Sequence, residues 1–379
     1  MTTTSLVGRE VPWARASLWL RSRNFDLTFI SLSAVTAMLP YLAYLLLWKS
    51  GLGRVFHTSW GLGADGSDAS RQAVNLVVTL FIGGPHMWAT FTRTFLDDSF
   101  RARYRTFLLS SMIIPAVVVL LGTNALGPTF PILVTGFFAW ASVHVLHQII
   151  YIMEAYNRKQ GTLSLTSRAI DYAVVLTSLY PLAAYRVSQD TFQIGPVNIS
   201  DVLPLWLQDW SLLFPLALTV FLIALVAFIA KTAREIRQGT VNWPKTLFLS
   251  LTVLVAFILP ALPNLDIAFQ GFNTWHSFQY LALVWYANRL KAEYVGYKSN
   301  LLRGLFGTED GHKYYFFHIG LTAISVLIIL FFIVVDVTRF GITLEQVYYM
   351  AVLSVLLVHY YHDHVLFSRP GDFMPATLG

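Results

Sequence analysis

Long apolar runs separated by short polar segments form the main hydrophobic pattern of this chain. A helix needs about 20 predominantly apolar residues to cross the hydrocarbon core of a bilayer. The pattern therefore predicts an all-α fold, a polytopic membrane bundle of about ten transmembrane helices. The expected spans are 27–48, 74–96, 105–124, 130–153, 166–185, 209–230, 245–263, 267–288, 314–336 and 345–367.

Basic residues are distributed unevenly between the loops. The N-terminal segment and the second, fourth, sixth and eighth loops each carry several Lys or Arg, whereas the third and seventh carry none. The first loop is the exception, with Lys49, Arg54 and Arg71. Because cytoplasmic loops are enriched in Lys and Arg, both termini are predicted to be cytoplasmic. An even number of spans agrees with this orientation.

The same pattern predicts the organisation of the chain. Residues 1–26 combine arginines with tryptophans and leucines, which is typical of a basic amphipathic segment at a membrane interface. Residues 27–368 are expected to form a single transmembrane bundle, and 369–379 a short C-terminal tail. We expect an integral membrane protein, located in a bacterial inner membrane.

Composition narrows the chemistry. The 379 residues are 56% hydrophobic and 12% charged, whereas soluble domains carry about 25% charged residues. The chain has no cysteine, which excludes disulfides, thiolate-ligated haem, iron–sulfur clusters and cysteine-based zinc sites. The net charge of +6 suits anionic lipid headgroups and does not indicate a nucleic-acid partner.

Histidines supply the candidate chemistry. Seven of the ten lie in four short clusters inside apolar segments. Ionisable side chains are costly in a bilayer and mark functional sites there. The clusters fall on the second, fourth, eighth and tenth expected spans at similar depth, which predicts one metal or haem site in the cytoplasmic third. They are Pro85-His86-Met87-Trp88, His144-Val145-Leu146-His147-Gln148, Trp275-His276-Ser277-Phe278-Gln279-Tyr280 and His359-Tyr360-Tyr361-His362-Asp363-His364.

Helical spacing of three, four or seven residues places side chains on one face, and each cluster extends into such a stripe. Imidazole is the commonest metal ligand, and neighbouring polar groups commonly orient it. A lone histidine in a membrane helix is better explained by a helix–helix hydrogen bond, but histidines at similar depth on four helices favour a metal or haem site. The stripes are His86, Thr90, Arg93 and Asp97; His144, His147, Tyr151 and Glu154; His276, Gln279 and Tyr280; and His359, His362 and Asp363.

These stripes assign candidate roles. Replacing His147 with alanine is expected to abolish metal loading, and the sequence does not decide whether His364 belongs to the site. Arg93 and Asp97 are expected to position a substrate head group or to support a ligand. The expected metal ligands are His86, His144, His147, His276, His359, His362 and Asp363. Glu154, Tyr151, Arg93 and Asp97 are the candidate catalytic residues, and Gln279 and Tyr280 are expected to contact the cofactor.

In its ligand chemistry the chain resembles the multi-histidine integral-membrane non-haem iron oxygenases and desaturases. It lacks their His-x-x-His-His boxes and has more spans. The resemblance implies an oxidoreductase with two iron ions that acts on a lipid-like or other hydrophobic substrate at the cytoplasmic side. A separate electron-donor protein is then expected. Copper, zinc or haem remain alternative cofactors, and a haem-binding electron-transfer or sensor protein and a histidine-lined transporter remain alternative functions.

Overall fold

The computed structural model describes residues 17–161, 164–208, 210–334 and 341–369, and most of these residues are helical. The first helices are α1 (Arg23–Phe25), α2 (Leu39–Lys49), α3 (Leu52–Trp60), α4 (Gly66–Val78), α5 (Gly84–Arg93), α6 (Asp98–Arg103), α7 (Arg105–Ser111), α8 (Ile113–Gly122) and α9 (Phe130–Gln160). They are followed by α10 (Leu165–Ser178), α11 (Tyr180–Ser188), α12 (Leu205–Gln208), α13 (Leu213–Arg237), α14 (Trp243–Ile258), α15 (Leu265–Tyr294), α16 (Asn300–Phe306), α17 (His312–Val334) and α18 (Leu344–Ser368).

Shorter elements connect or extend these helices. The π-helices are η1 (Asp26–Ser31) and η3 (Thr79–Gly83), and the 3₁₀-helices are η2 (Leu32–Met38), η4 (Ile199–Val202) and η5 (Leu259–Ala261). In the described residues the strands β1 (Gln193–Ile194) and β2 (Val197–Asn198) pair antiparallel in a small hairpin. The all-α architecture expected from the hydrophobic pattern is thus confirmed.

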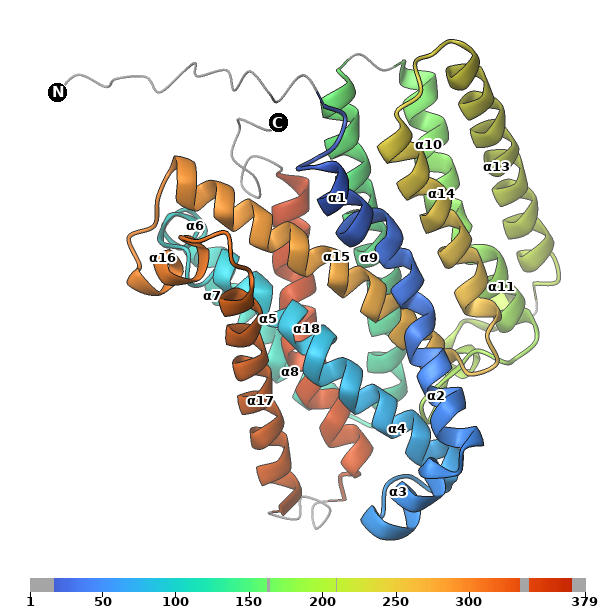
Figure 1. Ribbon diagram of the computed structural model, residues 1–379. Helices are drawn as coiled ribbons and strands as arrows, with labels where there is room; N and C mark the ends of the chain where they lie inside the picture. The colour runs from blue at the N-terminus through green and yellow to red at the C-terminus, as the bar shows by residue number, and fades with distance from the viewer. Residues whose placement is uncertain (1–16, 162–163, 209, 335–340, 370–379) are drawn as a thin grey trace.

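Eight of the helical segments in the described ranges are long and apolar enough to cross a membrane, as expected for an integral membrane protein. They gather into one bundle, in which α1 begins and α18 ends at the same end (Figure 1). The segments are Arg23–Lys49, Gly66–Arg93, Arg105–Gly122, Phe130–Gln160, Leu213–Arg237, Trp243–Ala261, His312–Phe331 and Gln346–Ser368.

The two remaining expected spans, 166–185 and 267–288, coincide with α10, α11 and α15. Pro181 lies in the first turn of α11, and its missing N–H ends the continuous helix after 14 residues of α10. At 1.5 Å per residue that helix is about 21 Å long, shorter than the hydrocarbon core of about 30 Å. The expected count of ten spans stays a prediction.

Helix α15 is the central element of the bundle. It has 30 residues and crosses the middle of Figure 1 obliquely, packed against α2, α4, α5 and the 3₁₀-helix η2. Its side chains are buried over most of its length, and many are polar, including Gln270, Thr274 and Asn288. Protein rather than lipid surrounds α15, which explains why it tolerates polar side chains that a lipid-facing helix would not.

Caps fix where α15 and α18 begin. The side chain of Asn264 accepts a hydrogen bond from the backbone N–H of Ile267 at the start of α15. Thr343 and Gln346 form a reciprocal capping box at the start of α18. Such caps satisfy amide groups that have no partner within the helix.

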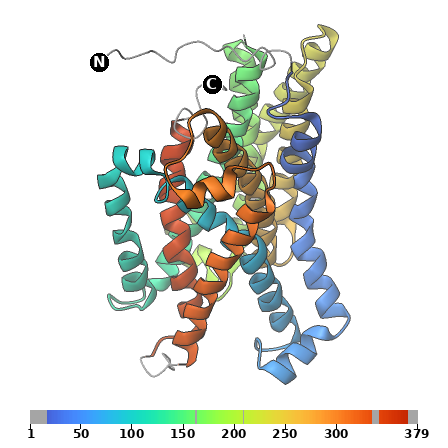
Figure 2. The same cartoon turned by 60° about the vertical axis from the view of Figure 1, so that its left-hand side comes forward.

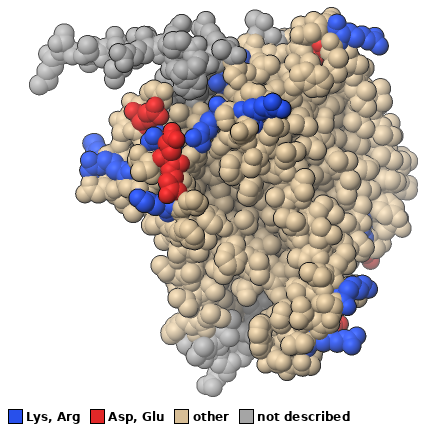
Figure 3. Space-filling model, in the orientation of Figure 1, with Lys and Arg blue, Asp and Glu red and all other residues tan. Residues whose placement is uncertain are grey.

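The bundle surface divides into charged ends and an uncharged middle. Lys, Arg, Asp and Glu side chains gather at the two ends of the face in Figure 3, and the broad band between them carries almost none. This distribution fits a membrane protein whose middle contacts hydrocarbon. In Figure 2 the α7–α8 segment stands at one edge of the bundle beside α18, with which α8 packs.

Candidate metal centre

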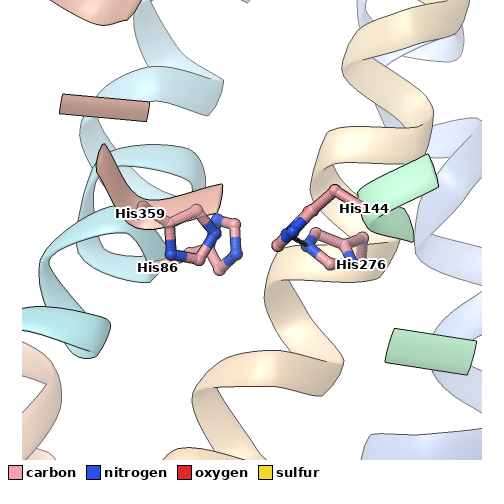
Figure 4. A group of neighbouring side chains, drawn as sticks. All are labelled: His86, His144, His276 and His359. Carbon is pink, nitrogen blue, oxygen red and sulfur yellow. Dashed lines mark hydrogen bonds between the residues drawn. The ribbon is translucent and has the colours of Figure 1, made fainter. Parts of the chain in front are cut away.

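Four histidines from four different helices meet inside the bundle. They are His86 of α5, His144 of α9, His276 of α15 and His359 of α18, and all are buried. One ring nitrogen from each lies within 4.8 Å of those of the other three. Figure 4 shows the rings facing one another, with His86 and His359 on one side and His144 and His276 on the other. These residues form the four-histidine group.

The spacing of the four nitrogens fits the first coordination shell of one metal ion. Imidazole nitrogens lie about 2.1 Å from a bound transition-metal ion. At that bond length two ligands at a right angle are about 3.0 Å apart, and two opposite ligands are about 4.2 Å apart. His144 Nε2 and His276 Nε2 are 3.0 Å apart. The widest pair needs a contraction of at most about 0.6 Å to reach the opposite-ligand distance.

Several ring nitrogens of this group have no hydrogen-bond partner. Both ring nitrogens of His86, Nδ1 of His276 and Nε2 of His359 are buried without a hydrogen-bond partner. Most buried polar atoms in proteins have a partner, so each exception needs an explanation. Unpartnered nitrogens on three of four adjacent imidazoles are explained if a metal ion accepts the lone pairs of the group. The four residues could therefore hold a metal ion.

A hydroxyl group orients His359 for this role. Nδ1 of His359 lies 2.6 Å from Oγ1 of Thr90, and the Thr90 hydroxyl donates to Oδ1 of Asp363 at 2.9 Å. Tyr280 donates its phenolic proton to the same carboxylate oxygen at 2.6 Å. Because the Thr90 proton is used by Asp363, the Thr90 oxygen accepts from the N–H of His359. This tautomer leaves the Nε2 lone pair of His359, which has no hydrogen-bond partner, free to bind a metal ion.

Asp363 flanks the four-histidine group. Its second oxygen, Oδ2, is buried without a hydrogen-bond partner and lies 3.7 Å from Nδ1 of His359 and 4.0 Å from Nε2 of His144. The carboxylate was expected as a metal ligand. It lies beside the ligands with one oxygen held by Thr90 and Tyr280, where its charge can stabilise a bound cation.

A break in helical geometry positions His86. The π-helix η3 leads directly into α5, and Pro85 follows in its first turn. Pro85 cannot donate to the carbonyl of Phe81 four residues earlier, and the hydroxyl of Tyr315 donates to that oxygen at 2.7 Å instead. Single-turn π-bulges often occur at functional sites because they rotate the following residues, here His86.

Two glycines before Pro85 allow neighbouring helices to come close. A Cβ atom on Gly83 would lie 2.8 Å from Nδ2 of Asn273 on α15, and one on Gly84 would lie 2.2 Å from Cγ2 of Thr322 on α17. Both distances are shorter than side chains tolerate. A larger residue at Gly84 would push α5 away from α17, and His86 with it, whereas one at Gly83 would require the Asn273 side chain to move.

Amide side chains tie α15 to its neighbours beside the group. Gln148 of α9 donates to the backbone carbonyl of His276 at 3.2 Å and to Oε1 of Gln279 at 3.3 Å. Gln279 in turn donates to the carbonyl of Ile30 at 2.6 Å. The amide of Gln279 is thus held between Gln148 and the Ile30 carbonyl, and its expected contact with a cofactor stays a prediction. The Tyr360 ring also stacks on His144, with centroids 4.0 Å apart.

Two histidines expected as ligands, His147 and His362, lie outside the four-histidine group. His362 Nδ1 lies 3.3 Å from the hydroxyl of Thr94, and its Nε2 lies 2.9 Å from that of Ser111. The ring of His147 lies against that of His364, with centroids 5.4 Å apart. We call these three the outer histidines. The expectation that His147→Ala abolishes metal loading does not follow from this geometry.

The expected Arg93–Asp97 pair forms a separate charged site. Arg93 donates to Asp97 at 2.7 Å, and the ammonium group of Lys291 lies 2.5 Å from the same oxygen. Asp97 also caps α6 through the backbone N–H of Ser99. Burial raises the pKa of Asp97, but Arg93, Lys291 and Ser99 together outweigh burial and hold it below the usual carboxyl value. These groups satisfy one another.

The other two candidate catalytic residues also have local partners. Glu154 accepts from Arg168 at 2.7 Å, which makes it part of a surface ion pair. Tyr151 is buried, and its ring centroid lies 5.2 Å from that of Phe367. Neither belongs to the four residues whose nitrogens converge. No role was predicted for Thr90, although it stands four residues after His86 in the same stripe and so shares the face of that histidine.

The comparisons with known proteins identify no family. No family model matches the chain, and neither curated proteins nor solved structures include a match.

Proposed function

We propose that the four-histidine group binds one redox-active metal ion, iron, and that the protein uses it to oxidise a hydrophobic substrate inside the membrane. The observation that carries this proposal is the convergence of four buried imidazoles, three of which have ring nitrogens without a hydrogen-bond partner. Imidazole suits iron, copper, zinc and nickel, and iron or copper would supply the activation of dioxygen. Iron remains the first choice and copper the alternative.

A single ion is a better proposal than the pair implied by the family resemblance. Among the histidines and carboxylates of the described residues, one group, the four-histidine group, is close enough together to hold a metal ion. The nearest carboxylate, Asp363, has one oxygen committed to Thr90 and Tyr280. His362, which was expected to extend the site, is engaged by hydroxyl groups. No second ligand set thus supports another ion in this part of the chain.

The arrangement favours a bare ion over haem. A porphyrin supplies four nitrogens itself and leaves two axial positions for protein ligands. The rings of His86 and His359 have centroids 4.2 Å apart, and those of His144 and His276 are 4.8 Å apart. A haem ligated by any two of these histidines would displace the other two. A transport path is less well supported, because the four imidazoles surround one point and do not follow one another along the membrane.

Oxidation of a substrate by dioxygen requires a source of electrons. Hydroxylation of a C–H bond by dioxygen places one oxygen atom in the product and reduces the other to water, and it consumes two electrons and two protons. The chain lacks the cysteines that an iron–sulfur cluster needs, so we propose a separate electron-donor protein. The loop charges support an approach of this donor from the cytoplasmic side.

Metal analysis of the purified protein tests the proposal. We expect about one iron per chain by mass spectrometry after purification in detergent, without a haem Soret band. His276→Ala should lose this metal, whereas His312→Ala, at an exposed position, should retain it. Wild-type protein that holds no iron or copper after anaerobic reconstitution would refute the proposal, and zinc alone would redirect it to hydrolysis.

A further inference from the structure

A cavity of about 260 Å³ opens beside the four-histidine group between α5, the α7–α8 segment and α18. Its walls include Phe91, Met112 and Val358, and His359 and Thr90 lie in the same wall. The cavity therefore reaches one metal-ligating ring and the hydroxyl group that orients it.

The wall of the cavity has few polar groups that could bind a ligand. None of the residues that line it is Lys, Arg, Asp or Glu. The hydroxyl of Ser354 donates to the carbonyl of Met350 at 2.6 Å, and both ring nitrogens of His362 face hydroxyl groups outside the cavity. A ligand here meets hydrocarbon and aromatic surface, which favours an apolar chain over a polar molecule.

The mouth of the cavity faces the bilayer. Met112 is 50% exposed and lies in the middle of Arg105–Gly122, one of the segments long and apolar enough to span a membrane. The neighbouring Ile113 is also exposed, and α7 and α8 stand at the edge of the bundle in Figure 2. A molecule that enters past Met112 therefore arrives from the hydrocarbon core.

We propose that this cavity binds a hydrocarbon chain of a membrane-dissolved substrate and delivers it laterally to the four-histidine group. This inference rests on the proposed function and names its substrate class. Ligand pockets usually measure about 300–1,000 Å³, so 260 Å³ holds a segment of a long chain while the remainder stays in the bilayer. The segment that reaches His359 and Thr90 is the part oxidised.

Met87 marks the inner limit of this chain site. It lines the cavity and also a second, smaller cavity of about 50 Å³, whose wall contains Phe137 and Tyr360. Met87 directly follows the ligand His86. A flexible thioether side chain between two cavities can rotate more readily than a branched or aromatic one. The depth that a chain reaches is thus expected to depend on Met87.

Photo-crosslinking tests the chain site. The probe is a long saturated alcohol with a diazirine near the middle of its chain, added to the full-length protein in phosphatidylcholine vesicles. After irradiation and proteolysis, mass spectrometry should find labels on the cavity residues of α5 and α18, such as Phe91 and Val358. Met112→Trp and Val358→Trp should lose these labels because the larger rings fill the cavity.

The matched control is Ile113→Trp, because Ile113 is exposed beside Met112 but does not line the cavity. This variant should keep the labels. Equal labelling of all lipid-facing helices, unchanged in Met112→Trp and Val358→Trp, would overturn the inference. Iron content is measured in the same samples, so cavity labels without metal would refute the proposed oxidation but leave the chain site standing. Metal without cavity labels would refute the chain site but leave the proposed function standing.

Discussion

Two helices, α9 and α18, carry both a member of the four-histidine group and outer histidines, and the two kinds of histidine have different surroundings. His144 and His147 share α9, and His359 and His362 share α18, each pair separated by three residues. That spacing corresponds to about 60° of rotation and about 4.5 Å of rise. The small rotation brings His144 and His359 among other imidazoles, whereas His362 meets the hydroxyls of Thr94 and Ser111.

Hydrogen bonding distinguishes His362 from the four-histidine group. The nitrogens of His362 already have partners, so a metal ion would have to break those contacts. In the four-histidine group, several nitrogens have no partner, and an ion would supply one. A His-x-x-His spacing on a helix is therefore not sufficient evidence that both histidines bind the same ion.

The largest effect is expected when the two histidines of the α9 pair are replaced one at a time. We expect His144→Ala to lose bound iron almost completely, because it removes one of four ligands and leaves the other imidazoles incompletely paired. His147→Ala should retain iron near the wild-type amount. Metal analysis of both purified variants, with size-exclusion chromatography to check folding, measures the difference. Loss of iron from both variants would mean that His147 belongs to the site.

Thr90→Val should weaken the site without removing a ligand. Valine keeps the shape of threonine but cannot accept from Nδ1 of His359 or donate to Asp363. Loss of such a supporting group typically lowers metal affinity about 10–100-fold. Competition with a chelator of known affinity would measure this change, and Thr90→Ser should restore most of it. Unchanged affinity in Thr90→Val would show that the hydroxyl does not orient His359.

His362→Leu should affect stability rather than metal content. The substitution removes the contacts to Thr94 and Ser111, and a typical hydrogen bond contributes about 1 kcal/mol. The Ser111 hydroxyl keeps its bond to the carbonyl of Leu108, so it is not left unpaired. Thermal unfolding in detergent should show a modest decrease in midpoint with unchanged iron. A loss of iron would place His362 among the ligands.

The smallest expected effect is a loss of wild-type stability in acid from the charged site around Asp97. At neutral pH the Asp97 carboxylate is ionised and its full contribution is present. Its pKa is lower in the folded protein than the unfolded value of about 3.9. The stability that it contributes is therefore present above about pH 4 and lost as the pH falls through the folded value. Unfolding measured from pH 7 to pH 3 should show this loss.

Asp97→Asn provides the control for the acid experiment. Asparagine can still cap α6 but carries no charge toward Arg93 and Lys291. The variant should be less stable than wild type at pH 7, and the gap should narrow at pH 3. Its iron content should stay unchanged, because Asp97 lies outside the four-histidine group. A gap that is constant with pH would show that the carboxylate charge does not stabilise the fold.

Local patterns predicted much of the candidate site. The four clusters identified the helices that contribute His86, His144, His276 and His359, because ionisable side chains stand out in apolar segments. The spacing between His359 and Asp363 also placed these two residues on one face, and they lie side by side in the fold. The patterns could not decide which histidine of each cluster joins the four-histidine group, and they gave no role to Thr90.

The sequence by itself determined the helical class, the apolar segments and the absence of thiolate ligands, because these depend on composition and on local hydrophobic length. Tertiary structure decided which imidazoles converge and which side chains support them. The rotation of each helix is set by long-range packing, such as the contacts of Gly83 and Gly84 with α15 and α17. A rotation of about 60° exchanges one histidine of a cluster for the next, and only the packed bundle fixes that angle.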